Sequence, residues 1–208
     1  DIIPMNVEWG KAADPDAIRR ALQIDGKIKA VLVTHNETST GVTNDLATIS
    51  RVVKEFDKLL LVDSISGMSS IKCPVDEWHL DVAISGSQKG WMVPPGLVFV
   101  SVSPEAWKAH AIAKMPRSYW DFTQAKRYLE RGQTPWTPAV SVVFAMDVAL
   151  DLMLKEGLAN IFARHARVGK AARAGVKSLG LSLFADEKYA SDTVTAVTAP
   201  EGLDVRGL

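Results

Sequence analysis

The segments LLLVDSISG (59–67) and DVAISGSQKG (81–90) decide the fold that this sequence predicts. Each begins with a short apolar run and ends in a turn rich in glycine and serine. A third run, KAVLV (29–33), leads into THNETSTG (34–41), and LVFVSV (97–102) provides a fourth. Continuous apolar runs of this length are typical of strands that are buried on both faces, as in parallel sheets. We therefore expect four buried strands in one sheet.

Helical segments separate some of these strands. In DPDAIRRAL (14–22), Asp14 suits an N-cap and Pro15 suits the first helical turn. The segment NDLATISRVVKEF (44–56) carries apolar residues at helical spacing along one face. Strands that are joined by helical crossovers predict an α/β fold with a mostly parallel sheet.

The second half of the sequence has a different character. Residues 103–139 contain four prolines and are predicted to be irregular. The segment VSVVFAMDVALDLMLKE (140–156) is a strongly apolar helix candidate that Gly157 ends, and a second helix is expected over 158–179.

Two short alternating segments follow these helices. LSLFA (181–185) and TVTAV (193–197) are typical of strands in a separate, smaller antiparallel sheet. We therefore place a domain boundary near residue 155. Residues 1–154 are predicted to form part of a large domain, and residues 155–208 begin a smaller α+β domain.

The composition excludes several classes of protein. The chain has 208 residues, 47% of them hydrophobic, and 24 basic residues balance 24 acidic ones. A net charge of zero disfavours electrostatic binding of nucleic acid. No apolar run approaches the roughly 18 residues of a membrane span. The single cysteine, Cys73, fits a reducing, cytoplasmic location, with an organellar one left open, and the four histidines lack the spacing of a metal site.

Polar residues follow three of the predicted strands directly. In an open parallel sheet, the loops at the carboxyl ends of the strands form the ligand crevice. Lys89 lies in one of these loops, and the apolar segment WMVPPG (91–96) follows it closely. An amine held against apolar walls is disfavoured in its charged form and becomes a nucleophile suited to Schiff-base chemistry. The alternative is a solvated loop lysine.

Asp63 ends the second predicted strand. A carboxylate in this position is expected to be half-buried and therefore to need a cationic or donor partner. The pyridinium nitrogen of pyridoxal 5′-phosphate (PLP) is such a partner, because an aspartate beside it maintains the electron sink of the cofactor. The alternative is an N-cap of the following segment. The presence of Lys89 after the next strand favours the PLP interpretation.

The segments VTHNETSTG (33–41), LLLVDSISG and DVAISGSQKGWMVPPGL (81–97) resemble the signature segments of the class V, fold-type I PLP-dependent aminotransferases. The alanine–glyoxylate and serine–glyoxylate aminotransferase branch is the most similar, and TPWTPAVS (134–141) resembles another segment of that family. The resemblance implies a PLP-transferase fold and a homodimer with a shared active site. It also implies transfer of an amino group from a small amino acid, such as alanine or serine, to glyoxylate or pyruvate.

The resemblance also implies roles for single residues. Lys89 would form the internal aldimine and move a proton, and Asp63 would pair with the pyridine nitrogen. Thr38 would hydrogen-bond near the PLP ring, and Gln88 would contact the cofactor phosphate. Thr137 matches a threonine that family members lend to the phosphate of the neighbouring subunit. Ser85 and Ser87 are further candidates on the phosphate side.

Members of the family are nearly twice as long as this chain. The resemblance therefore implies that the sequence is the central part of such an enzyme, truncated, which puts its independent activity in doubt and leaves the parent function clear. The arginine that clamps the substrate carboxylate is expected outside this chain, because Arg206 lies too early for that role.

Two other functions remain open at this stage. A cysteine desulfurase or lyase of the same superfamily would keep the cofactor, but those enzymes carry a histidine before the lysine and a catalytic cysteine later in the chain. Here Gln88 precedes Lys89, and no cysteine follows Cys73. The other alternative is a dimerising relative without catalytic activity.

Overall fold

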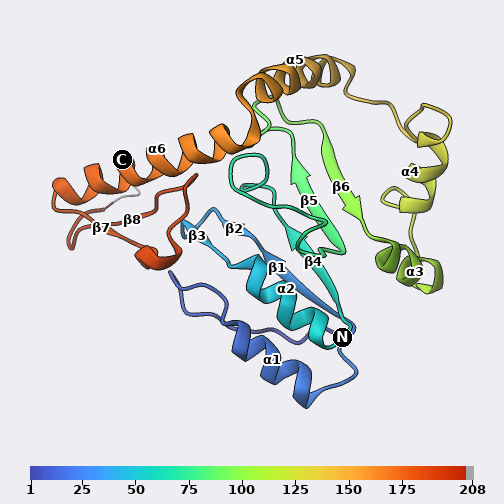
Figure 1. Cartoon of the computed structure of the whole chain (residues 1–208), viewed down its shortest axis with the longest axis horizontal. Coiled ribbons are helices and arrows are strands. Elements are labelled where there is room, and N and C mark those ends of the chain that lie inside the picture. The colour runs from blue at the N-terminus through green and yellow to red at the C-terminus, as the bar shows by residue number, and fades with distance from the viewer. Residues whose placement is uncertain (205–208) are drawn as a thin grey trace.

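The computed structural model describes residues 1–204, so Arg206 lies outside the described residues. Its centre is a four-stranded sheet (Figure 1). The strands lie in the order β1 (Ala30–Thr34), β4 (Leu59–Asp63), β5 (Val82–Gly86) and β6 (Val98–Val102). The strands β1, β4 and β5 are parallel, and β6 runs antiparallel to β5. The predicted α/β fold with a mostly parallel sheet is confirmed.

Two helices pack on one face of this sheet. They are α1 (Pro15–Ile24), which begins after the predicted N-cap Asp14, and α2 (Leu46–Glu55). Their apolar faces meet alternate residues of β1, β4 and β5 in the main hydrophobic core, whose buried members are Ile18, Leu22, Leu46, Ile49, Val52, Val53, Leu60, Val62, Leu80 and Ala83. The helical spacing in the sequence thus identifies the face that the core buries.

The opposite face of the sheet is open at its two edge strands. Leu32 of β1 is 76% exposed and Val98 of β6 is 61% exposed. The expectation of burial on both faces is therefore wrong for β1 and β6, whereas β5 is buried on both faces as expected. The physical reason is that both hydrophobic clusters of residues 1–204 use strand side chains from the face opposite to Leu32 and Val98. Val31 and Val33 pack in one cluster, and Phe99 packs in the other.

The segment 103–139 contains two helices, α3 (Pro104–Ile112) and α4 (Phe122–Leu129), where an irregular chain was predicted. Pro104 stands in the first turn of α3, a position that proline favours, and Ser103 accepts a hydrogen bond from the Ala106 amide as the N-cap. The proline that suggested irregular structure therefore marks the beginning of a helix.

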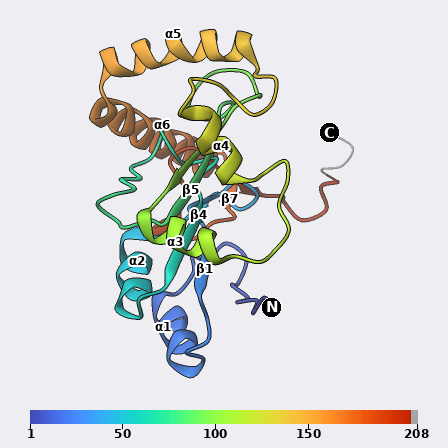
Figure 2. The same cartoon turned by 90° about the vertical axis from the view of Figure 1, so that its right-hand side faces the viewer.

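The two long helices are as predicted. The helix α5 (Val140–Glu156) ends at Gly157, whose φ of 82° is accessible to glycine, and α6 (Leu158–Ser178) begins directly after it. Both views place α5 at the end of the molecule away from α1 (Figure 2). No helix within residues 1–204 is both long enough and apolar enough to cross a bilayer.

The chain then returns to the loop that follows β1. The strands β7 (Ser182–Leu183) and β8 (Val197–Thr198) pair antiparallel, as predicted, but are only two residues long, and the 3₁₀ turn η1 (Glu187–Tyr189) lies between them. Near them lies the small hairpin of β2 (Asn36–Glu37) and β3 (Val42–Thr43) (Figure 1). An isolated bridge between Val42 and Ala190 joins the two parts of the chain.

A buried carboxylate ties the strands together at the amino end of β5. Asp81 is 3% exposed at its side chain. Its Oδ2 accepts from the Leu60 amide at 2.7 Å and from the Lys54 ammonium, and its Oδ1 accepts from the Ser103 hydroxyl at 2.9 Å. Each of these contacts joins a different element to β5, so the carboxylate holds the sheet at the end opposite to Lys89.

His35, directly after β1, is buried and neutral. Its ring lies edge-on to Trp78, with 6.3 Å between centroids, and its Nδ1 has no hydrogen-bond partner among the described residues. Burial lowers the pKa of His35 from 6.5 to about 4. The unfolded chain therefore binds a proton at a higher pH than the folded protein does.

We expect this histidine to make the protein acid-sensitive. Above pH 6.5, the neutral, buried His35 makes its full contribution to the free energy of unfolding. This contribution is lost as the pH falls from 6.5 towards 4, at about 1.4 kcal/mol per pH unit and at most about 3 kcal/mol in total. Denaturant unfolding at several pH values measures the effect. The variant His35→Phe keeps an aromatic ring beside Trp78 and should flatten this part of the pH profile. An unchanged profile in the variant would contradict the assignment.

Candidate active site

Lys89 lines a pocket of about 370 Å³ at the carboxyl end of the parallel strands. Three hydroxyl-bearing residues of the strand loops, Thr38, Ser66 and Ser70, line the same pocket. Thr38 comes from the turn between β2 and β3, and the two serines come from the turn after β4. The loops at the carboxyl ends of three neighbouring strands therefore converge here, as expected for a parallel sheet.

The Lys89 turn is held by backbone hydrogen bonds. The Lys89 amide donates to the Gly86 carbonyl at 3.4 Å, and the Met92 amide donates to the Lys89 carbonyl at 3.0 Å. The residue is exposed, and its ammonium makes no hydrogen bond or ion pair with any residue in the range 1–204. The backbone is thus fixed while the amine stays uncommitted, which is the state that a lysine needs to react with a ligand.

Gly90 brings the Lys89 turn against the turn that follows Asp63. A Cβ atom on Gly90 would lie 2.4 Å from the hydroxyl oxygens of both Ser69 and Ser70, and 2.7 Å from the Met68 carbonyl oxygen. Real Cβ contacts are not this short, so only glycine allows the two turns to meet. The position of Lys89 relative to the turn after β4 therefore depends on Gly90.

The variant Gly90→Ala should lower the free energy of unfolding by about 1–3 kcal/mol, because overpacking forces the two turns apart. The displacement should also weaken any ligand that bridges the turns. A matched control is Gly175→Ala in α6, where an added Cβ meets nothing within 4 Å. That variant should instead gain about 0.5–1 kcal/mol from helix propensity. Equal stabilities of the two variants in denaturant unfolding would show that the close approach is unimportant.

Asp63 lies at the end of β4, on the strand next to the one that leads to Lys89. It pairs in register with Thr34 of β1 and Ile84 of β5. The expectation of a half-buried carboxylate is wrong, because the residue is exposed on the sheet face that the core does not cover. Its Oδ1 accepts from the Ile65 amide at 2.9 Å, a local turn contact. No residue within 1–204 occupies Oδ2, so one carboxylate oxygen stays available to a ligand.

The other predicted residues are distributed unequally. Thr38 shares the pocket with Lys89, whereas Asp63, Gln88 and Thr137 do not line it. The Gln88 amide oxygen lies over Gly86, 3.0 Å from where a Cβ would stand on that glycine. Thr137 is exposed in the loop before α5.

Ser85 and Ser87 do not serve as phosphate-side groups in this structure. Both are completely buried. The Ser85 hydroxyl accepts from the Trp91 indole nitrogen at 2.8 Å, and the Ser87 hydroxyl donates to the Pro94 carbonyl at 2.8 Å. Their hydrogen bonds shape the Lys89 turn from the inside.

Part of the pocket lining was not predicted from the sequence. Arg164 and His165 of α6 and Thr193 of the segment after η1 also line the pocket. Both guanidinium contacts of Arg164 go to Glu156, at 2.6 and 2.9 Å, and Nδ1 of His165 donates to the Ile161 carbonyl at 2.8 Å. Helical spacing could have placed Arg164 and His165 on one face of α6 together with Ile161 and Val168, but could not have placed that face beside Lys89.

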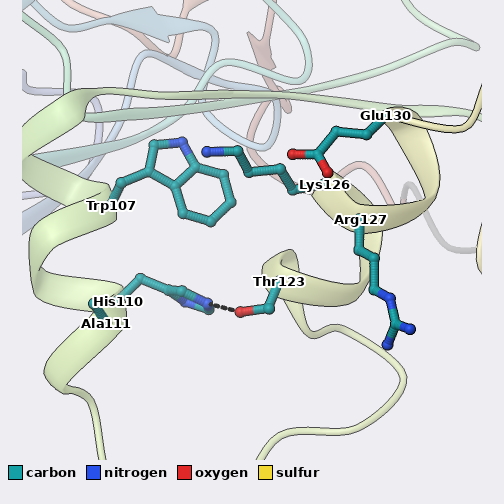
Figure 3. A pocket seen from close by; sticks show the side chains of 7 residues that line it. All are labelled: Trp107, His110, Ala111, Thr123, Lys126, Arg127 and Glu130. Atoms are coloured by element: carbon teal, nitrogen blue, oxygen red, sulfur yellow. Dashed lines mark hydrogen bonds between the residues drawn. The ribbon is translucent and has the colours of Figure 1, made fainter.

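A second hollow lies between α3 and α4, and none of the predicted site residues lines it (Figure 3). Its lysine is already engaged, because the Lys126 ammonium lies over the Trp107 ring at 4.9 Å from the centroid. His110 is bonded to the Thr123 hydroxyl at 2.8 Å. Lys126 and His110 are thus engaged within the protein, and we assign the hollow no function.

Fold and site together define an α/β protein with an uncommitted lysine and an available carboxylate at the carboxyl ends of neighbouring strands. The sequence profile of the aminotransferase class-V family matches residues 1–204. The chain therefore belongs to the class V aminotransferase family.

The individual relatives include named aminotransferases and one protein named as a hydrogenase subunit. The chain is 47% identical to the "soluble hydrogenase 42 kDa subunit" of Anabaena cylindrica, over 94% of this chain and 52% of that protein. It is 39% identical to a serine–glyoxylate aminotransferase of Methylorubrum extorquens, over 98% of this chain and 53% of that protein. The crystal structure of pyridoxamine–pyruvate aminotransferase from Mesorhizobium loti superimposes with a TM-score of 0.92 at 35% identity, over 97% of this chain and 53% of that one. The chain thus spans about half the length of the relatives it matches.

Proposed function

We propose that the protein is a PLP-dependent aminotransferase that moves an amino group from a small amino acid, such as alanine or serine, to a 2-oxo acid such as glyoxylate or pyruvate. The observation that carries this proposal is the uncommitted Lys89 amine in a pocket beside the strand that Asp63 ends. Relatives named as serine–glyoxylate and pyridoxamine–pyruvate aminotransferases support it.

The residues present suit PLP. The cofactor needs an amine for covalent attachment, a carboxylate for its ring nitrogen and donors for its oxygens. Lys89 and the open oxygen of Asp63 provide the first two. The Thr38 hydroxyl lines the pocket, and the buried Ser69 hydroxyl, directly against Gly90, has no partner among residues 1–204. An orphaned donor at this place is consistent with a polar ligand beside the turn.

When bound, PLP supplies an electron sink that stabilises negative charge at the substrate α-carbon. Asp63 would keep the ring nitrogen protonated, since a carboxylate favours the cationic form of its neighbour. Lys89 would hold the cofactor and then, once released by the substrate amine, move a proton from the α-carbon to C4′ of the cofactor. Gln88 would donate a hydrogen bond to the cofactor phosphate. Thr38 would form a hydrogen bond near the PLP ring.

A desulfurase reaction is less well supported by this chain. Cys73 packs against the main hydrophobic core, and burial raises the pKa of its thiol to about 11. A thiol with that pKa is almost entirely protonated at neutral pH and is a poor nucleophile. A lyase and a non-catalytic relative remain as outcomes of the test below.

The test is a half-reaction with the purified protein. PLP is added, the visible spectrum is recorded, and alanine or serine is then supplied without an acceptor. An aminotransferase should bleach the visible band and yield pyridoxamine phosphate together with the 2-oxo acid, both measured by mass spectrometry. Release of ammonia or sulfide instead would identify a lyase or a desulfurase. A protein that binds no PLP would refute the proposal.

We further propose that the protein is a homodimer whose two active sites are shared. Residues 115–140 expose Trp120 at 78%, Tyr119 at 56% and Trp136 at 44%, and the last two rings stack with 4.9 Å between centroids. Exposed tyrosine and tryptophan are enriched at protein interfaces. Thr137 follows these rings directly and would reach the cofactor phosphate of the partner. The division into a large domain, 1–154, and a smaller one, 155–208, and the cytoplasmic location belong to the same proposal.

A mixed dimer tests the shared site. A Lys89→Ala subunit is paired with a Thr137→Ala subunit, with a different affinity tag on each. If the sites are shared, one site collects both lesions and the other is intact, so about half of the wild-type activity per dimer should return. Activity no higher than the mean of the two parent dimers, or a fully active monomer by light scattering, would contradict the arrangement.

A further inference from the structure

A single amide joins three distant segments behind the Lys89 pocket. Asn36, at the start of β2, is 2% exposed. Its Nδ2 donates to the hydroxyls of Ser66 at 2.9 Å and Thr193 at 3.1 Å. Its Oδ1 accepts from the hydroxyls of Thr43 at 2.7 Å and Ser191 at 2.6 Å. Two donors and two acceptors are the full capacity of an asparagine amide, so every position is used.

Ser191, which donates to the Asn36 amide oxygen, organises the segment around it through further hydrogen bonds. Its side chain is completely buried, and its hydroxyl oxygen also accepts from the amides of Thr193 at 3.0 Å and Val194 at 3.2 Å. The Ser191 amide donates to the Gly41 carbonyl at 2.8 Å. The turn over 191–194 is therefore fixed to a loop about 150 residues earlier in the sequence through Asn36 and Gly41.

The two sides that Asn36 joins are both walls of the pocket. Ser66, from the turn that follows Asp63, and Thr193 and Val194, from the segment after η1, all line it, and the Thr193 hydroxyl also donates to the Ser66 carbonyl at 3.3 Å. Asn36 does not line the pocket itself, and its side chain makes no contact with Lys89 or Asp63. Its influence on a ligand therefore passes through the walls of the pocket, not directly through Lys89 or Asp63.

A buried polar cluster of this kind specifies one arrangement. When every group is satisfied, the cluster is rigid, whereas removal of the central amide leaves several buried hydroxyls to find new partners. Aspartate has the shape of asparagine but lacks the Nδ2 donors, and glutamine adds a methylene to a packed site. The amide of Asn36 is thus matched to this position in size and in hydrogen-bonding pattern.

We propose that Asn36 is a positioning residue that fixes residues 191–194 as a wall of the Lys89 pocket. This inference rests on the proposed aminotransferase function for its kinetic consequence. Because Asn36 is bonded to the wall and not to Lys89 or Asp63, its loss should impair recognition of the amino donor and spare attachment of the cofactor.

The experiment compares Asn36→Ala with Ser50→Ala in the purified protein. Ser50 is a matched control, because its hydroxyl is also buried and donates to the Trp78 carbonyl, away from the pocket. Amide hydrogen exchange of 191–194 should be about tenfold faster in Asn36→Ala, as expected for loss of a buried hydrogen bond, and unchanged in Ser50→Ala. The KM for the amino donor should rise about tenfold in Asn36→Ala, with the visible spectrum of bound PLP unchanged.

Two results would overturn the inference. One is exchange at 191–194 that matches the wild type, or that rises equally over the whole chain. The other is faster exchange at 191–194 with an unchanged KM, which would show a wall without a role in recognition. The exchange measurement needs no cofactor or activity. If the wild-type protein binds no PLP, the proposed function fails, while exchange at 191–194 still decides whether Asn36 fixes the wall.

Discussion

Replacing Lys89 with alanine should abolish transamination and leave the fold nearly unchanged. The side chain makes no contact that stabilises residues 1–204, so the unfolding midpoint should stay close to that of the wild type. Turnover should fall by at least about 10⁴-fold, because the variant loses the covalent attachment of the cofactor as well as a general acid–base group, which alone contributes about 10²–10⁴-fold. Steady-state kinetics at saturating PLP measure the loss.

The attachment site can be mapped directly. Borohydride reduction of the PLP-loaded protein, followed by peptide mass spectrometry, should find the label on Lys89. Lys72→Ala removes a lysine that pairs with Glu77 on the surface, and this control should keep full activity and the same label. A label on any other lysine would show that the assignment of Lys89 is wrong.

Replacing Asp63 with asparagine should retain some PLP binding and lose most of the rate. The neutral amide keeps the shape of the side chain but cannot stabilise a protonated ring nitrogen. We expect kcat to fall by more than about tenfold, which corresponds to about 1.4 kcal/mol of transition-state stabilisation. Unfolding should change little, because the contact with the Ile65 amide uses an oxygen that asparagine also has.

Asp76→Asn provides the control for this prediction. Asp76 is an exposed carboxylate later in the same connection between β4 and β5, and its replacement should leave kcat unchanged. The visible spectrum separates two explanations of a slow Asp63→Asn enzyme. A shift in the band of bound PLP indicates a changed protonation state of the ring, whereas loss of the band indicates lost binding. A loss of rate smaller than about tenfold would contradict the proposed role of Asp63.

Local sequence patterns predicted most of the secondary structure. The helix α5 has the predicted bounds, and the four strands of the sheet lie within one residue of their predicted starts. These elements have strong apolar periodicity and clear end signals at Asp14 and Gly157. The helices α3 and α4 were missed because their short apolar pattern is weak and prolines surround them.

Burial was predicted less well than secondary structure. An apolar run such as KAVLV is compatible with cover on one face or on both, and only the surrounding elements decide which. Leu32 is exposed because α1 and α2 pack against the alternate residues Val31 and Val33. The exposure of Asp63 follows from the same geometry, since it lies on the uncovered side of β4.

The candidate site was predicted only on the side of the strand loops. Lys89 and Thr38 share a pocket because carboxyl ends of parallel strands meet at one edge, a rule that applies without knowledge of tertiary contacts. His165 and Thr193 could not be placed there in advance. Their position depends on the path of α6 and on contacts with Asn36 across more than 150 residues, for which the sequence carries no local signal.

The junction between the β2–β3 hairpin and residues 190–194 has a consequence for the order in which the molecule is made. On the ribosome, the strands of the sheet emerge early and can pair while α6 is still being synthesised. The bridge from Val42 to Ala190 closes a very long loop, so it must form late, after most of the described chain has left the exit tunnel. In a nascent chain, the loops around Lys89 are therefore made before residues 190–194 complete the pocket. Ligand capture during synthesis therefore has to wait until residues 190–194 have been made.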